Sequence, residues 1–345
     1  DDRPAVSRES DAIVAVRVDR VITRTASKRG RFAVGVWDAQ TGDAIVRRRA
    51  DEALRPASVQ KLATTAAALL ALGAEHELST DVFAEWRRDA GDDPVRLIVR
   101  GGGDPGFCGR NTGGDVEAEL RGLARAVRAR GIRRVSGDLV RDGTAFPPPQ
   151  RHPDWGRREG EYDWWMAPVS ALVLNDNCVD VTVTPGERVG QPARLVAVPA
   201  TSAVRFDNRL VTVGRRQEHS IRFAAPGDDG SIRALGGVLV NTTGYSASLA
   251  CVEPQAYFGD VFRRLLAEEG VTIEGGTVLL DTTGAVSARD PGPSVRTERV
   301  ARHGTPVVEV VAVSNTRSQN LYAELLLRRL GQERGELLAA VAAED

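Results

Sequence analysis

The stretch from Leu54 to Gly73, LRPASVQKLATTAAALLALG, constrains the fold of this chain more than any other. Pro56 and Ser58 are typical of a helix start, since proline fixes the entry of the chain and serine caps free backbone amides. From Ala63 to Leu72 nearly every residue is apolar or a strong helix former, and Gly73 supplies the stop. A helix that is apolar on most faces must be buried on most of them. The stretch therefore predicts a central helix inside a larger core.

One charge in this helix is unusual. The chain has 46 Lys and Arg residues, but only two of them, Lys28 and Lys61, are lysines. Arginine stays protonated in proteins, whereas a lysine removed from water shifts its pKa downwards and can accept a proton. Lys61 lies three residues after Ser58, so the two side chains share a helix face and can act as nucleophile and base. The alternative is that Ser58 only caps the helix and Lys61 is a solvated surface charge.

Bulk composition excludes several classes of protein. The 345 residues exceed the usual size of one domain, so we expect two or more cores. A net charge of −1 gives no electrostatic reason to expect nucleic acid or an anionic membrane surface. No run approaches 18 apolar residues, so no membrane span is expected. The chain starts at Asp1 without an initiator methionine, which suggests a processed or trimmed product whose signal peptide has been removed.

Motifs for metals and common cofactors are absent from the sequence. Cys108, Cys178 and Cys251 form no C-x-x-C pair and are expected to be buried apolar residues. The histidines show no H-E-x-x-H spacing, and no G-x-S-x-G elbow occurs. The run GGGDPG at 101–106 fits G-x-G-x-x-G, but Pro105 interrupts the helix that a dinucleotide site requires. We therefore interpret that run as a turn.

Periodicity indicates a mixed α/β chain with a β-rich middle. Strands are expected on both sides of a turn at 40–43, at 95–100 and 135–140, in short segments from 178 to 225, and at 278–281. Helices are expected at 116–130, 255–269 and 318–330, with the last ending at Gly331. Residues 146–165 are expected to form a long irregular loop with His152 at its surface. We expect the aromatic side chains of this loop to pack it against the core rather than to stack on sugar rings. These residues are Trp155, Tyr162, Trp164 and Trp165.

Two motifs together resemble a known family. The run from Pro56 to Gly73 matches P-A-S-x-x-K followed by an alanine-rich helix. Near the end of the chain, RSQNLYAELLLRRLG contains the S-x-N motif as Ser318 and Asn320, followed by an L-x-A-E helix. Both resemble the low-molecular-mass class C penicillin-binding proteins, which are serine D-Ala-D-Ala carboxypeptidases and endopeptidases. Weaker matches are GGGDP at 101–105 and APVSALVLNDN at 167–177.

The resemblance implies a role for each motif residue. Ser58 would attack the carbonyl of a D-Ala-D-Ala peptide bond and form an acyl-enzyme, with Lys61 as the base. Ser318 would relay a proton towards the leaving amine, and Asn320 would bind the amide of the substrate. The partners implied are peptidoglycan stem peptides and β-lactam inhibitors, with no metal or cofactor. The implied location is the periplasm or the outer face of the cell envelope.

The resemblance also implies a domain plan. A β-lactamase/transpeptidase-like α/β sandwich domain would comprise residues 1–84 plus 294–345. An inserted α/β domain would comprise 85–165 plus 236–293, with a β-rich domain at 166–235 nested inside it. The family carries a third motif, K-T-G, after S-x-N, and no K-T-G exists in this chain. The C-terminal part of the catalytic domain is therefore expected to be missing from these residues, unless the chain is a non-catalytic relative.

Three functions fit these observations. The first is a serine D-Ala-D-Ala carboxypeptidase or endopeptidase. The second is a peptidoglycan-binding relative that has the fold but no turnover. The third is a β-lactamase or esterase that uses the same serine and lysine, since the nucleophile chemistry is shared.

Overall fold

Within its described residues, the N-terminal part of the chain forms an α-helix, a β-hairpin and a short 3-10 helix. The computed structural model describes residues 9–25, 31–88, 91–151, 162–224, 231–280 and 295–344, and the chain divides into two units, Asp1–Gln60 and Lys61–Asp345. In the first unit the Asp38 carboxylate accepts hydrogen bonds from the amides of Gln40 and Thr41, which closes the turn predicted at 40–43. The elements of this unit are α1 (Glu9–Thr25), β1 (Val34–Trp37), β2 (Ala44–Arg48) and the 3-10 helix η1 (Ala57–Val59).

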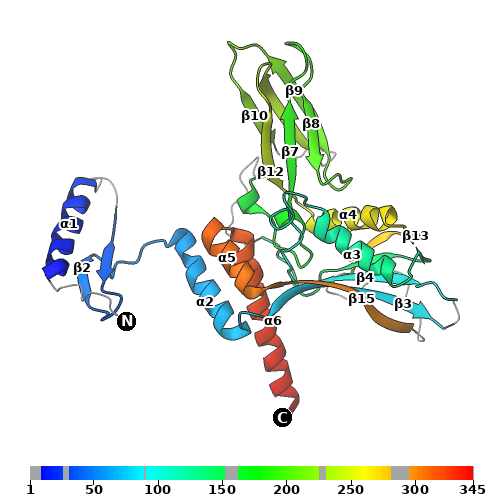
Figure 1. The fold of residues 1–345 in the computed structure, drawn as a ribbon, viewed down its shortest axis with the longest axis horizontal. Helices are drawn as coiled ribbons and strands as arrows, with labels where there is room; N and C mark the ends of the chain where they lie inside the picture. The colour runs from blue at the N-terminus through cyan, green and yellow to red at the C-terminus, as the bar shows by residue number, and fades with distance from the viewer. Residues whose placement is uncertain are drawn as a thin grey trace. The chain divides into compact units, whose positions relative to one another are not determined.

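The second unit contains a five-stranded sheet with the order β14-β6-β4-β3-β15. Strands β4, β6 and β14 run parallel, whereas β3 pairs antiparallel with both β4 and β15. Helices α3 and α4 share one hydrophobic core with this sheet and lie side by side (Figure 1). The bounds are β3 (Glu77–Arg87), β4 (Arg96–Gly101), β6 (Leu139–Asp142), β14 (Thr277–Leu280), β15 (Val295–Pro306), α3 (Ala118–Ala129) and α4 (Pro254–Glu268); β5 (Arg134–Val135) and β13 (Thr272–Ile273) form a short parallel pair.

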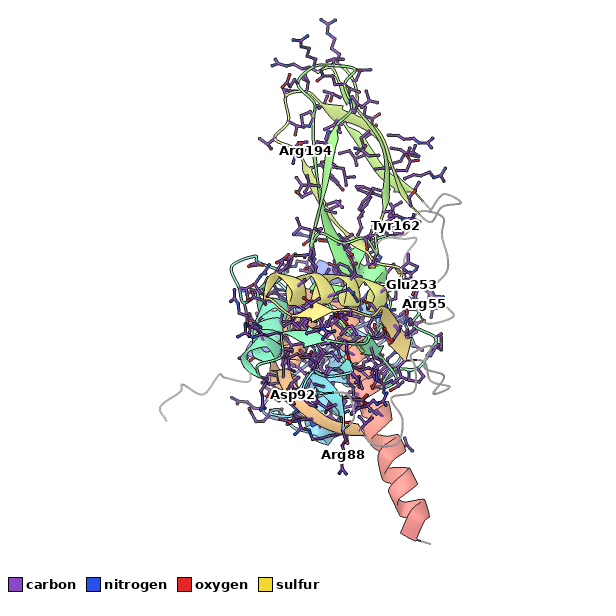
Figure 2. The ribbon with its side chains drawn as sticks, turned by 90° about the vertical axis from the view of Figure 1, so that its right-hand side faces the viewer. Arg55, Arg88, Asp92, Tyr162, Arg194 and Glu253 are labelled. Carbon is purple, nitrogen blue, oxygen red and sulfur yellow. The ribbon has the colours of Figure 1, made fainter. Side chains whose placement is uncertain are left out.

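The middle of the sequence forms two three-stranded sheets, as the run of short β segments predicts. Their orders are β12-β7-β8 and β10-β11-β9, so β10 and β12 are edge strands. Apolar side chains from both sheets form two shared clusters, and the strands extend away from α3 and α4 (Figures 1 and 2). The bounds are β7 (Cys178–Thr184), β8 (Arg194–Val198), β9 (Phe206–Val213), β10 (Ser220–Ala224), β11 (Ile232–Leu239) and β12 (Tyr245–Ala250), preceded by the 3-10 helices η2 (Trp164–Met166) and η3 (Asn175–Asn177).

The helix α2 (Gln60–Leu72) is less buried than the sequence predicts. Gly73 ends it with a φ of +88°, as expected. Its buried residues are Lys61, Thr65 and Ala68, which are spaced four and three residues apart and so lie on one face. Leu70, on the other side, is 88% exposed. The prediction of burial on most faces is therefore wrong for the part of the chain that the structure describes, because the core shared with the C-terminal helices covers one face only.

Two C-terminal helices replace the single one predicted at 318–330. Helix α5 (Val307–Arg317) follows β15 directly, and α6 (Asn320–Glu344) follows after a break at Ser318. Ser318 adopts the left-handed conformation, with φ of 56°, which ends α5. The expected stop at Gly331 is wrong, since α6 continues past it; an exposed glycine costs a helix only about 1 kcal/mol.

Several smaller predictions can be compared with the described residues. The GGGDPG run is a turn after β4, and the next helix begins only at Ala118. The three cysteines are free and buried. Among the described residues, no helix is both long and apolar enough to cross a membrane. His152 and Trp155 lie outside the described residues.

Candidate active site

Lys61 and Asn320 are 259 residues apart in the sequence and meet within the second unit. The Lys61 ammonium donates a hydrogen bond from Nζ to Oδ1 of Asn320 over 2.6 Å. The other end of the Asn320 amide donates from Nδ2 to the backbone carbonyl of Trp165 at 3.0 Å. Because both ends of the amide are engaged, its orientation is fixed. The structure therefore joins one residue of each sequence motif.

The surroundings of Lys61 shift its pKa in the direction that favours loss of a proton. Burial lowers its pKa, and the carboxylate of Glu324, one turn along α6 from Asn320, raises it in part. The residue is only 9% exposed, so its ammonium has lost much of its hydration. Desolvation disfavours the charged form of an amine. An arginine at this position could not make use of that effect, because its guanidinium stays protonated.

The second motif lies in the turn between α5 and α6. Ser318 is exposed and left-handed, Gln319 is buried with 6% exposure, and Asn320 begins α6. Non-glycine residues adopt the left-handed conformation only at a cost, and they cluster at functional sites. Across this turn Ser318 is exposed, Gln319 is buried and Asn320 is partly buried.

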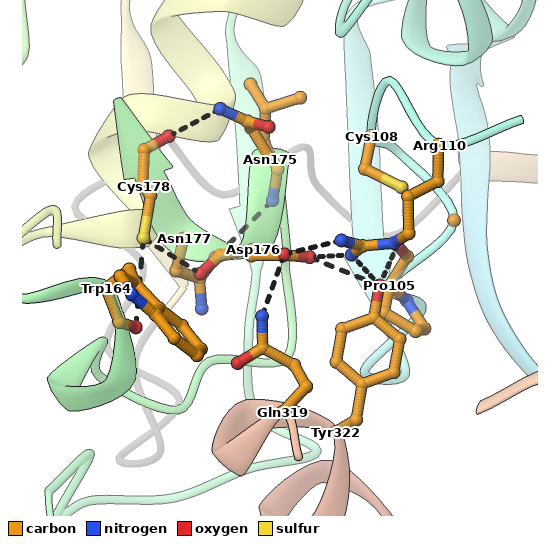
Figure 3. A network of polar contacts seen from close by, with 12 residues as sticks. Pro105, Cys108, Arg110, Trp164, Asn175, Asp176, Asn177, Cys178, Gln319 and Tyr322 are labelled. Atoms are coloured by element: carbon orange, nitrogen blue, oxygen red, sulfur yellow. Dashed lines mark hydrogen bonds and ion pairs between the residues drawn. The ribbon is translucent and has the colours of Figure 1, made fainter. Parts of the chain in front are cut away.

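A buried polar network anchors that turn (Figure 3). The Gln319 side-chain amide donates to Oδ2 of Asp176 at 2.9 Å. The guanidinium of Arg110 donates to both oxygens of the same carboxylate, from Nη1 at 2.9 Å and from Nη2 through a shorter contact. The Tyr322 hydroxyl lies 3.1 Å from Asp176 Oδ1 and 3.2 Å from the carbonyl oxygen of Pro105. One carboxylate thus connects the turn before α6 with the loop after β4.

The charges in this network stabilise each other. Burial alone would lower the pKa of Arg110, but the hydrogen bond and charge of Asp176 outweigh it and raise that pKa. Burial raises the pKa of Tyr322 well above its ordinary value, so the phenol stays protonated. The Arg110 guanidinium also lies over the Tyr322 ring, 5.0 Å from its centroid. The network therefore holds one ion pair and one neutral hydroxyl.

Ser58 belongs to the first unit and lies in η1, directly before α2 in the sequence. Its side chain is exposed. The preceding residue, Ala57, has a φ of 47°, a left-handed conformation that costs an alanine about 1–3 kcal/mol. Strained backbone beside a candidate nucleophile is consistent with a functional position, since such strain persists only where surrounding structure maintains it.

The aromatic residues of the long loop divide into two kinds. Tyr162 is buried, and its carbonyl accepts a hydrogen bond from the Ala250 amide at 2.7 Å. Trp164 and Trp165 are 38% and 44% exposed. The prediction that the aromatic residues pin the loop to the core therefore holds for Tyr162 but not for the two tryptophans, which keep much of their surface open.

The sequence did not identify the network residues as part of the site. Asp176 lies in the stretch 167–177 and Arg110 just after 101–105, both of which had matched the family only weakly. The available signal in the sequence was the run Asn-Asp-Asn at 175–177, because these residue types tolerate a positive φ best, and all three adopt one in the structure. Their partners are 66 and 143 residues away, which spacing within a motif cannot reveal.

Comparisons with known proteins agree with the motifs and the fold. The profile of the D-Ala-D-Ala carboxypeptidase 3 (S13) family matches residues 14–343. A D-alanyl-D-alanine carboxypeptidase of Actinomadura sp. (strain R39) is 30% identical over 323 residues, which are 92% of this chain and 57% of that protein. A carboxypeptidase of Mycobacterium tuberculosis is 27% identical over 284 residues, 79% of this chain and 59% of that protein.

A solved structure has the same fold. Penicillin binding protein 4 from Haemophilus influenzae superposes with a TM-score of 0.72 at 20% identity, and covers 90% of this chain and 64% of its own. The mixed α/β architecture is therefore that of a penicillin-binding protein. The chain belongs to the D-Ala-D-Ala carboxypeptidase 3 (S13) family. It spans a little over half the length of the first two relatives described above.

Proposed function

We propose that this chain is part of a serine D-Ala-D-Ala carboxypeptidase that acts on peptidoglycan stem peptides. The observation that carries the proposal is the 2.6 Å contact between Lys61 and Asn320, because it joins the S-x-x-K and S-x-N motifs. Membership of the family supports the same reaction. By this proposal the protein works outside the cytoplasmic membrane, where peptidoglycan is found.

Each residue then has a defined chemical step. Ser58 Oγ attacks the carbonyl carbon of the penultimate D-Ala and forms an ester, while Lys61 accepts the hydroxyl proton. The C–N bond breaks, and the terminal D-Ala leaves as an amine after receiving a proton through Ser318. Asn320 binds the substrate amide, and Lys61 holds that asparagine in place. Water then hydrolyses the ester and restores Ser58.

A β-lactam follows the first half of this scheme. Attack by Ser58 opens the lactam ring, and the released nitrogen remains attached to the acyl group. The protein therefore gains the mass of the whole drug. The chain contains no K-T-G triplet, so we assign no residue to the carboxylate of the substrate or inhibitor.

The test is intact-mass measurement after incubation with benzylpenicillin, with Ser58→Ala as the matched control. An adduct in the parent that disappears in Ser58→Ala supports the nucleophile and the enzyme class. An adduct that survives in Ser58→Ala refutes the assignment. Absence of an adduct in the parent has two explanations, the missing K-T-G motif and a non-catalytic peptidoglycan-binding relative, and the same assay on the full-length gene product separates them. A β-lactamase would release the hydrolysed drug quickly, whereas a carboxypeptidase keeps the adduct and releases D-Ala from a D-Ala-D-Ala peptide.

A further inference from the structure

A cavity of about 890 Å³ lies beside the candidate active site and has no role in the reaction above. One wall is the segment from Tyr162 to Trp165, and the other walls are the edge strands β10 and β12 with part of β11. Figure 2 shows Tyr162 at the base of the β-rich strands. A hollow of this size falls within the range of sites that bind small organic ligands, roughly 300–1,000 Å³.

Three aromatic side chains that line this cavity remain partly exposed to solvent. Trp164, Trp165 and Tyr245 all line it, and they are 38%, 44% and 39% exposed. The two indole rings stand at 88° to each other with centroids 5.8 Å apart, so they present faces in two directions. Exposed aromatic faces gathered in one hollow are costly in water and typically mark a binding surface.

Polar groups in the same hollow narrow the class of ligand. Arg222 is exposed on β10, and Ser246 and Ser248 are exposed on β12. The Tyr162 hydroxyl is buried and has no hydrogen-bond partner among the described residues. Aromatic faces pack against the C–H faces of pyranose rings, while guanidinium and hydroxyl groups bond their acetamido and hydroxyl oxygens. Ser246 and Ser248 already contact Thr182 and Asp180 on β7, so Arg222 is the exposed charge in this hollow that favours a ligand with acceptor oxygens.

The cavity wall is fixed to the candidate active site. Asp163 forms a β-bridge with Leu249, which attaches the aromatic segment to β12. Two residues later, the Trp165 carbonyl accepts the hydrogen bond from Asn320. Trp165 therefore borders the cavity and also holds the amide of the candidate site. Because Trp165 belongs to both places, a stem peptide bound at Asn320 would lie next to the cavity.

We propose that this cavity binds the N-acetylated glycan that carries the stem peptide. The proposal rests on the proposed function, because it takes the peptide bound at Lys61 and Asn320 to be joined to that glycan. The cavity would thereby favour substrates that are still attached to their sugar over free peptides.

Binding tests the proposal without catalysis. The probe is the disaccharide N-acetylglucosaminyl-N-acetylmuramic acid, titrated into Ser58→Ala protein by calorimetry. We expect about tenfold weaker binding after adding Tyr245→Ala or Arg222→Ala, since each removes one stacking or hydrogen-bonding group. Tyr245→Trp, which retains an aromatic face, should preserve binding. Arg216→Ala is the matched control, because Arg216 is an exposed arginine that does not line the cavity. Trp165 is left unchanged because replacing its side chain can displace the backbone carbonyl that accepts the hydrogen bond from Asn320.

Failure of this proposal and failure of the proposed function give different results. Disaccharide binding that depends on Tyr245 supports the cavity assignment even if benzylpenicillin leaves no adduct. No disaccharide binding, or equal binding by every variant, overturns the assignment even if the adduct forms. A free stem peptide that binds through Tyr245 and Arg222, while the disaccharide does not, assigns the cavity to peptide and also overturns it.

Discussion

Replacement of Asp176 by asparagine tests whether the buried network stabilises the fold. Asp176 and Arg110 have side chains that are 15% and 19% exposed, so the pair is mostly removed from water. Asparagine keeps the size of the side chain and tolerates the left-handed backbone at this position, where φ is 56°. The substitution therefore keeps the shape of the side chain, removes its charge, and turns one acceptor oxygen into an NH2 donor that faces the donors of Arg110.

The expected loss of folding free energy depends on which contacts Arg110 keeps after the substitution. Removing one partner of a buried ion pair costs about 3–5 kcal/mol, because the remaining charge is left uncompensated. Arg110 would still contact the Tyr322 hydroxyl and lie over its ring, which places the expected loss at the lower end, about 3 kcal/mol. Asp176→Ala should lose roughly a further 1 kcal/mol, since alanine is strained at a positive φ.

Urea denaturation followed by tryptophan fluorescence measures these losses. The matched variant is the double substitution Arg110→Met with Asp176→Asn, which removes both charges, keeps a residue type that tolerates the positive φ, and should cost less than Asp176→Asn alone. Because Gln319 loses its acceptor in Asp176→Ala, acylation by benzylpenicillin should also slow. A single variant Asp176→Asn with the stability of the parent would refute this account of the network.

Three further predictions concern protonation. Lys61→Arg should preserve the circular dichroism spectrum but abolish acylation, because arginine cannot act as the base; an unchanged acylation rate contradicts this. Glu324→Gln removes the carboxylate that raises the pKa of Lys61, so the acid limb of the acylation rate should move to lower pH, and a move to higher pH reverses the assignment. Burial lowers the pKa of His303, but the carboxylate of Asp104 outweighs burial and raises that pKa. Asp104 Oδ2 lies 2.6 Å from His303 Nδ1, and the charges of Glu119 and Glu77 act in the same direction. The stability from this pair is fully present below the unfolded pKa of about 6.5 and is lost as pH rises through the higher folded value. In His303→Gln the free energy of unfolding should no longer fall with rising pH on account of this pair. Urea denaturation midpoints of the parent and the variant, measured from pH 5 to 9, test this.

The sequence predicted the local features that depend on residue type and spacing. The turn at 40–43, the stop at Gly73 and the two motifs are all short-range patterns, and the turn and stop appear in the structure as expected. The pairing of Lys61 with Asn320 was accessible only through resemblance to a family. The roles of Ser58, Lys61, Ser318 and Asn320, and the domain boundaries, stay predictions.

Features that depend on distant partners were missed or wrong. The carboxylate of Asp176 anchors Gln319 across 143 residues, which no local pattern encodes. The exposure of Leu70 could not be predicted either, because helix periodicity shows which residues are apolar and not which elements cover them. The continuation of α6 through Gly331 reflects a penalty of about 1 kcal/mol, which the rest of a long helix outweighs.

The separation of 259 residues between Lys61 and Asn320 also determines when each residue is synthesised. A ribosome adds roughly 5–20 residues per second, so this interval of synthesis lasts about 13–50 s. During it, Lys61 has been made but the asparagine that holds it has not. Closure of so long a loop is also slow compared with the formation of local helices. The candidate site is therefore among the last parts of the chain to form, and a nascent chain carries its lysine for many seconds without a complete active site.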